Sequence, residues 1–136
     1  MQAPRLVKTS TILKQFASSR EGRALPLGTG WSRTLVDFAR ERLGRNIPEI
    51  GGAQLEEILF RVFPQQVMCG PSEARSIVVE LRAFFRFLKR EHGFDSADDC
   101  LGVLNASAER RLQRLLIHPA AFGTAKVFFL SASEGS

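Results

Sequence analysis

The side chains that most often carry metal or reaction chemistry are few and widely spaced in this 136-residue sequence. It has two Cys, two His and no Tyr. Structural zinc sites bring their ligands in close pairs, because a short knuckle orients two ligands at once. The candidate ligands here are Cys69, His92, Cys100 and His118, and even the nearest two are eight positions apart. We therefore expect no metal centre and no cofactor.

Catalytic pairs have no supporting motif in this sequence. A Cys-His pair or the pair His92 and Asp95 would need a nucleophile turn, oxyanion donors and an orienting third group, and no motif supplies them. The triplet Gly28-Thr29-Gly30 is too short for a phosphate-binding loop and follows no predicted strand. We expect no catalytic residues and no enzyme activity.

The more informative chemistry is a row of cations at helical spacing. Arg82, Arg86 and Arg90 recur every four residues with Lys89 beside them, and no acid lies three or four positions from Arg86. One interpretation is a solvated face whose arginines pair with acids of neighbouring helices. The other is a phosphate-contacting stripe, which the basic N-terminus and three further cations would join: Arg110, Arg111 and Arg114. Most Phe residues fall on predicted core stripes, which argues against base stacking.

The formal net charge of +5 is concentrated near the N-terminus. Residues 1–25 carry +4 of it, from Arg5, Lys8, Lys14, Arg20 and Arg23 against Glu21. This acid-poor segment fits a basic helix or arm, and a mitochondrial transit peptide is the alternative. Polar residues interrupt the apolar stretch that a secretory signal would need, so we do not expect secretion.

A long Phe-rich helix, from about residue 71 to 92, is the strongest structural feature of the sequence. Pro71 suits a first turn, apolar residues follow at 3.6-residue spacing, and Gly93 suits a left-handed cap. Phe87 lies off the main apolar stripe, so the helix is apolar on more than half of its circumference. It is therefore predicted to lie in the middle of a bundle.

Shorter helices are predicted on both sides of this one. Gly44, Pro64 and Pro119 are expected to end helices, and Ser96 is expected to cap one. Val67, Met68 and Cys69 are read as a buried connection, and whether Cys69 pairs with Cys100 stays open. The predicted segments are helices over about 5–18, 31–44, 55–62, 97–117 (with a possible break at 105–107) and 120–130, and a link over 21–30.

These elements predict a single all-α bundle of about five or six helices around the Phe-rich helix. The expected organisation is a basic N-terminal segment with its linker (1–30), a helical domain (31–130) and a disordered tail (131–136). No apolar run approaches the roughly 20 residues that a membrane span requires. A membrane partner is therefore not expected.

Three segments carry a resemblance to a known family. They are Phe63-Pro64-Gln65-Gln66-Val67, the stretch from Glu80 to Leu88, and His118-Pro119-Ala120-Ala121-Phe122-Gly123-Thr124-Ala125-Lys126, of which the last is the most specific. Over about residues 31–130 the chain resembles a family of all-helical bacterial proteins without an established activity. The resemblance implies the helical fold and a bacterial cytoplasmic location, which disfavours the transit peptide, and it transfers no site residues.

A well-specified core without a reaction centre favours a non-enzymatic protein-interaction module. Its partner would be another protein or a second copy of the chain, bound through apolar residues beyond the core stripes such as Phe60, Phe63 or Phe87. The alternative is a nucleic-acid-binding module that uses the basic N-terminus and the Arg82/Arg86/Arg90 row for phosphate contacts.

Overall fold

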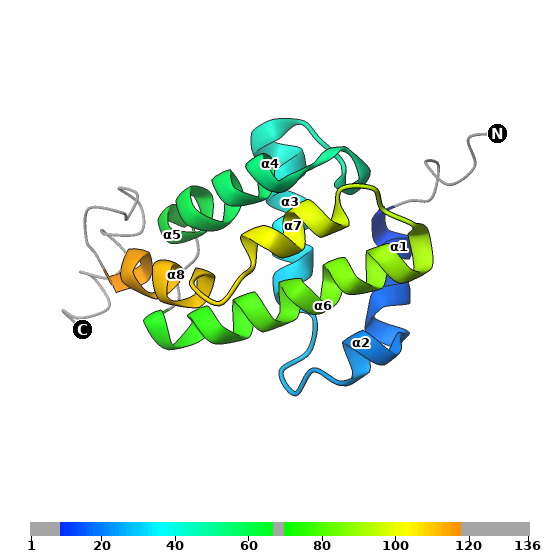
Figure 1. Cartoon of the computed structure of the whole chain (residues 1–136), viewed down its shortest axis with the longest axis horizontal. Helices are drawn as coiled ribbons and strands as arrows, with labels where there is room; N and C mark the ends of the chain where they lie inside the picture. Colours follow the sequence, from blue (N-terminus) through cyan, green and yellow to red (C-terminus); the bar gives the residue numbers. More distant parts are fainter. Residues whose placement is uncertain (1–8, 67–69, 118–136) are drawn as a thin grey trace, which may run out of the picture.

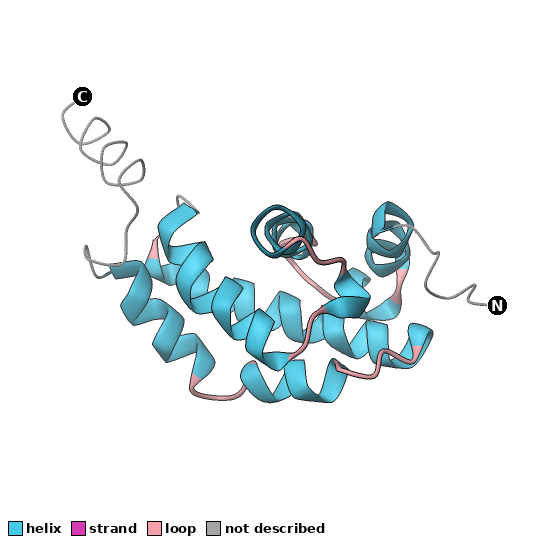
Figure 2. Ribbon diagram, turned by 90° about the horizontal axis from the view of Figure 1, so that it is seen from above, coloured by secondary structure: helices cyan, strands magenta, loops and turns pink. Residues whose placement is uncertain are grey.

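The computed structural model describes residues 9–66 and 70–117, and every regular element in these ranges is a helix (Figures 1 and 2). The predicted all-α fold is confirmed. The α-helices are α1 (Thr9–Ser18), α2 (Arg20–Arg23), α3 (Gly30–Leu43), α4 (Gly52–Glu57), α5 (Phe63–Gln66), α6 (Ala74–His92), α7 (Ala97–Val103) and α8 (Ala108–Ile117). Short 3-10 turns, η2 (Ile47–Glu49) and η4 (Pro71–Glu73), precede α4 and α6, and a π-helical turn, η3 (Ile58–Val62), joins α4 to α5.

Helix α6 is the axis of the molecule, as its sequence predicts. Helices α1 and α2 pack on its C-terminal half, α7 runs along it, and α8 covers its N-terminal end (Figure 1). Pro71 opens the 3-10 turn before α6, and Gly93 ends the helix with a φ of 58°. Phe84, Phe85 and Phe87 are all buried, so α6 has core contacts on most of its circumference.

The core reaches further towards the N-terminus than the predicted domain of residues 31–130. Ile12 and Phe16 of α1 are buried, and the Phe16 ring lies 5.1 Å from that of Phe84 and 5.5 Å from that of Phe87. The idea that the basic segment lies outside the core is therefore wrong for α1. Lys14, the basic residue of α1, is exposed, while the apolar face of the helix completes the core.

Pro64 does not end its helix, which corrects the prediction for residues 55–62. The helical path continues through α5, because the preceding turn widens into a π-helix in which the Phe63 N–H donates to the Ile58 carbonyl. In a regular α-helix the proline ring would clash with the carbonyl four residues earlier. A π turn changes that spacing, so the chain passes Pro64 without stopping.

Two other boundaries differ from the predictions. The link predicted over 21–30 contains the short helix α2, whose first turn is capped by a bond from the Gly22 N–H to Ser19 Oγ at 3.1 Å. Ser96 precedes α7 as predicted, but its side chain makes no capping hydrogen bond.

The break between α7 and α8 lies where the sequence predicts it. Asn105 Oδ1 accepts hydrogen bonds from the backbone N–H of Ser107 at 3.0 Å and from its hydroxyl at 2.7 Å. The predictions for Val67 to Cys69, the helix over 120–130 and the tail lie outside the described residues.

Candidate functional site

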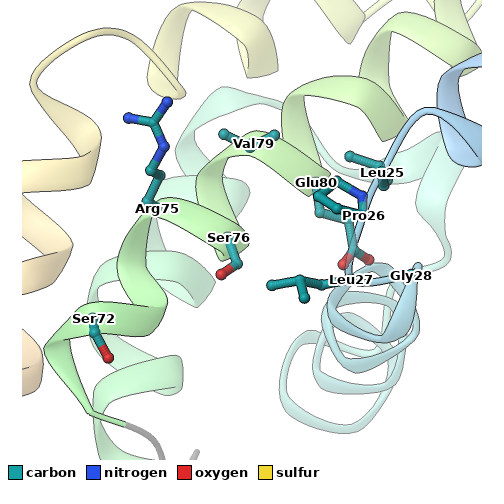
Figure 3. A pocket seen from close by; sticks show the side chains of 9 residues that line it. All are labelled: Leu25, Pro26, Leu27, Gly28, Ser72, Arg75, Ser76, Val79 and Glu80. Atoms are coloured by element: carbon teal, nitrogen blue, oxygen red, sulfur yellow. The ribbon is translucent and has the colours of Figure 1, made fainter.

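A groove of about 220 Å³ lies between the α2–α3 link and the N-terminal half of α6 (Figure 3). Leu27 extends from the link towards Ser76 of α6. The walls are mainly apolar on the link side and mixed on the α6 side. The lining residues are Leu25, Pro26, Leu27, Gly28, Ser72, Arg75, Ser76, Val79 and Glu80.

The groove holds the exposed large apolar side chains of the described residues. Leu27 is 75% exposed and Val79 is 42% exposed, and both line the groove. The apolar surface that the sequence places at Phe60, Phe63 and Phe87 is instead internal, since these side chains are at most 8% exposed. The predicted apolar patch is therefore wrong in position.

Local backbone geometry fixes the link in place. The Leu25 N–H bonds to the Gly22 carbonyl at 3.1 Å, and Leu25 itself packs against the core. Gly28 has a φ of 86°, a conformation that side chains other than glycine rarely adopt. This left-handed turn lets the chain leave Leu27 at the surface and enter α3 two residues later.

A buried carboxylate closes the inner wall of the groove. Glu80 is 4% exposed, and its Oε2 accepts the backbone N–H of Ser32, in the first turn of α3, at 2.5 Å. Burial raises the pKa of Glu80, while the hydrogen bonds from the start of α3 act in the opposite direction. Glu80 therefore anchors the N-terminus of α3 to α6.

The cation row on α6 divides into paired and unpaired members. Arg90 makes a two-point contact with Glu21, with nitrogen–oxygen distances of 2.8 and 2.6 Å, and Lys89 Nζ lies 2.8 Å from Asp98 Oδ1. Arg90 holds the pKa of Glu21 at about 2. Arg82 and Arg86 form no ion pair with any described residue. The interpretation that these cations pair with acids of neighbouring helices therefore holds, among the described residues, for Lys89 and Arg90, and not for Arg82 and Arg86.

The three α8 cations do not extend this row. Arg111 lies 3.0 Å from Glu56 and its guanidinium stacks 4.0 Å above the Phe60 ring. Arg110 and Arg114 are exposed on α8, which packs at the other end of α6 (Figure 1). A continuous phosphate-contacting stripe through all of these cations is therefore not present.

The described Cys and His residues occupy structural positions. Cys100 is buried, and burial raises the pKa of its thiol to about 12. His92 Nε2 lies 2.9 Å from Gln15 Oε1, and its ring packs against Phe87. Residues 9–66 and 70–117 contain no group of three or more metal-ligating side chains. Cys69 and His118 lie outside these ranges.

The groove is the feature that sequence reasoning missed. A signal existed, since Leu25-Pro26-Leu27-Gly28 places two leucines in a link where polar residues are usual. Val79 gives no such signal, because one further apolar residue on a Phe-rich helix resembles core.

Comparisons with protein-family models, with curated proteins and with solved structures found no match. No helix within the described ranges is both long and apolar enough to cross a membrane.

Proposed function

We propose that the chain is a non-enzymatic protein-interaction module whose groove takes an apolar side chain of a partner. The observation that carries this proposal is the convergence of Leu27 and Val79 on one groove. Burying one leucine-sized side chain contributes about 1.5–3 kcal/mol. The groove volume of about 220 Å³ is smaller than the roughly 300–1,000 Å³ of typical small-molecule sites. It suits one or two side chains of a peptide.

To test this, random 16-residue displayed peptides are selected for binding to the full chain. The affinity of the selected peptides is then measured by fluorescence anisotropy. We expect selected peptides to lose about tenfold or more in affinity for Leu27→Asp, because the new charge would enter the apolar contact. Ala53→Asp makes a comparable change at an exposed position on α4 and serves as the control. Equal binding to the wild-type chain and Leu27→Asp would contradict the proposal.

Nucleic-acid binding is a second candidate, favoured by the lack of ion pairs at Arg82 and Arg86. Less charge is available for it than the sequence predicts, because Lys89, Arg90 and Arg111 are engaged by acids. Oligonucleotide binding that weakens steeply with salt and falls in Arg86→Glu would support it. We further propose a bacterial cytoplasmic protein, on the resemblance of the three sequence segments alone.

A further inference from the structure

Three arginines of α6 lie along the same face as Val79. Arg75 precedes Val79 by four residues, and Arg82 and Arg86 follow it by three and seven. At 100° per residue these four positions fall within about 60° of one another on the helix. The rise of about 1.5 Å per residue puts Arg82 and Arg86 roughly 4.5 and 10.5 Å beyond Val79. We call Arg75, Arg82 and Arg86 the arginine edge; Arg75 lines the groove, and Arg82 and Arg86 lie beyond it along α6.

The arginine edge has little negative charge around it. Arg82 and Arg86 have no ion pair with a described residue, and Arg75 reaches only Glu109, at 3.9 Å, with its side chain 77% exposed. The nearby carboxylates are engaged elsewhere: Glu80 by the start of α3 and Glu21 by Arg90. Arg75 thus lines the apolar groove, and Arg82 and Arg86 follow on the same face of α6 without an ion pair to a described residue. Their guanidinium groups suit carboxylate contacts.

We infer that the partner is an acidic amphipathic peptide segment. Its apolar side chain fills the groove at Leu27 and Val79, and carboxylates within about 10 Å of that side chain meet Arg82 and Arg86. This inference rests on the proposed function. A nucleic acid would match the charge but leaves the apolar groove without a use, and the described Phe rings that pack in the core are not available for stacking.

The experiment uses the full chain and two labelled 16-residue helical peptides that share one leucine stripe. One carries Glu and the other Lys at the positions flanking the stripe. We expect the Glu peptide to bind about three- to tenfold more tightly at 50 mM salt, since two exposed ion pairs contribute modestly, and the difference to narrow at 300 mM. The double variant Arg82→Glu/Arg86→Glu should reverse the preference.

The matched control is Arg110→Glu/Arg114→Glu, which makes the same change in net charge at two exposed positions of α8 that do not line the groove. If this control reverses the preference equally, net charge rather than the arginine edge is responsible and the inference is overturned. If both peptides bind with equal affinity and both lose affinity in Leu27→Asp, the inference is overturned and the proposed function stands. Binding that ignores Leu27→Asp, or no binding by either peptide, contradicts both.

A 20-nucleotide single-stranded DNA probe separates the remaining class of partner. The DNA could bind more tightly than the Glu peptide, depend on Arg82 and Arg86 and be unaffected by Leu27→Asp. That result would assign the arginine edge to phosphates and overturn the inference.

Discussion

At the residue scale, Glu80 is the side chain whose chemistry departs most from its sequence context. Its neighbours in the sequence are apolar and belong to the helix that is predicted to pack in the core. A charged side chain is ordinarily exposed, so Glu80 would be expected at the surface of this helix. Its burial follows from α3, whose first turn supplies N–H donors to the carboxylate. Sequence alone cannot show this contact, because Ser32 and Glu80 are 48 positions apart.

The raised pKa of Glu80 predicts a specific pH dependence. Between the usual pKa of 4.5 and the raised pKa, the Glu80 carboxyl group is ionised in the unfolded chain and protonated in the folded chain. The unfolding free energy of the wild type, relative to that of Glu80→Gln, should therefore fall as pH rises from 4.5 through the raised pKa. Urea unfolding of both proteins between pH 4 and 8 measures this difference.

Glu41→Gln is the control for the Glu80 experiment, because it removes one negative charge from an exposed site on α3. A difference between the wild type and Glu80→Gln that rises with pH would contradict the expectation. It would mean that the N–H groups of α3 favour the ionised carboxylate more than burial disfavours it.

At the element scale, the sequence predicts helices whose ends are marked by local chemistry. Helix α6 is predictable because Pro71, Gly93 and the 3.6-residue spacing act independently and agree. The continuation of the helix through Pro64 is not predictable, because the π turn that accommodates the proline depends on the packing of the whole α4–α5 segment. The groove is unpredictable for a related reason, since it exists only where the link meets α6.

The corner between α1 and α2 gives a prediction at this scale. A Cβ at Gly22 would lie 2.0 Å from the Phe16 carbonyl oxygen, which is backbone and cannot move aside alone. We expect Gly22→Ala to lower the unfolding free energy by about 1–3 kcal/mol, as overpacking does. Chemical denaturation measures the loss.

Gly102→Ala is the matched control for Gly22→Ala. Gly102 also lies in a helix, α7, but a Cβ there meets nothing within 4 Å. Alanine should stabilise the protein by about 0.5–1 kcal/mol through helix propensity. Similar effects of the two substitutions would mean that the corner is not tightly packed.

At the scale of the whole molecule, the basic N-terminal segment is part of the structure that it was predicted to flank. Its net charge is readable from the sequence, and so is the helical face that contains Phe16. The surface against which that face packs cannot be read from the sequence, because Phe84 and Phe87 lie far along the chain. The predicted separation between segment and domain failed at this point.

Phe16→Ala tests the role of α1 in the core. We expect a loss of about 3–5 kcal/mol in unfolding free energy, because the substitution leaves a cavity against α6. Lys14→Ala changes an exposed side chain of the same helix and should alter stability by less than about 0.5 kcal/mol. Equal, small effects would show that α1 is peripheral, and only then could residues 1–25 be deleted without loss of the fold.

The contact between α1 and α6 also determines an order of events during synthesis. Gln15 of α1 and His92 of α6 are 77 positions apart, so α1 is made well before its partner surface. At about 5–20 residues per second, that separation corresponds to roughly 4–15 s of translation. Throughout that interval the part of the apolar face of α1 that packs against Phe84 and Phe87 has no α6 to cover it. The first described helix to be synthesised thus completes its burial only after α6 has been made.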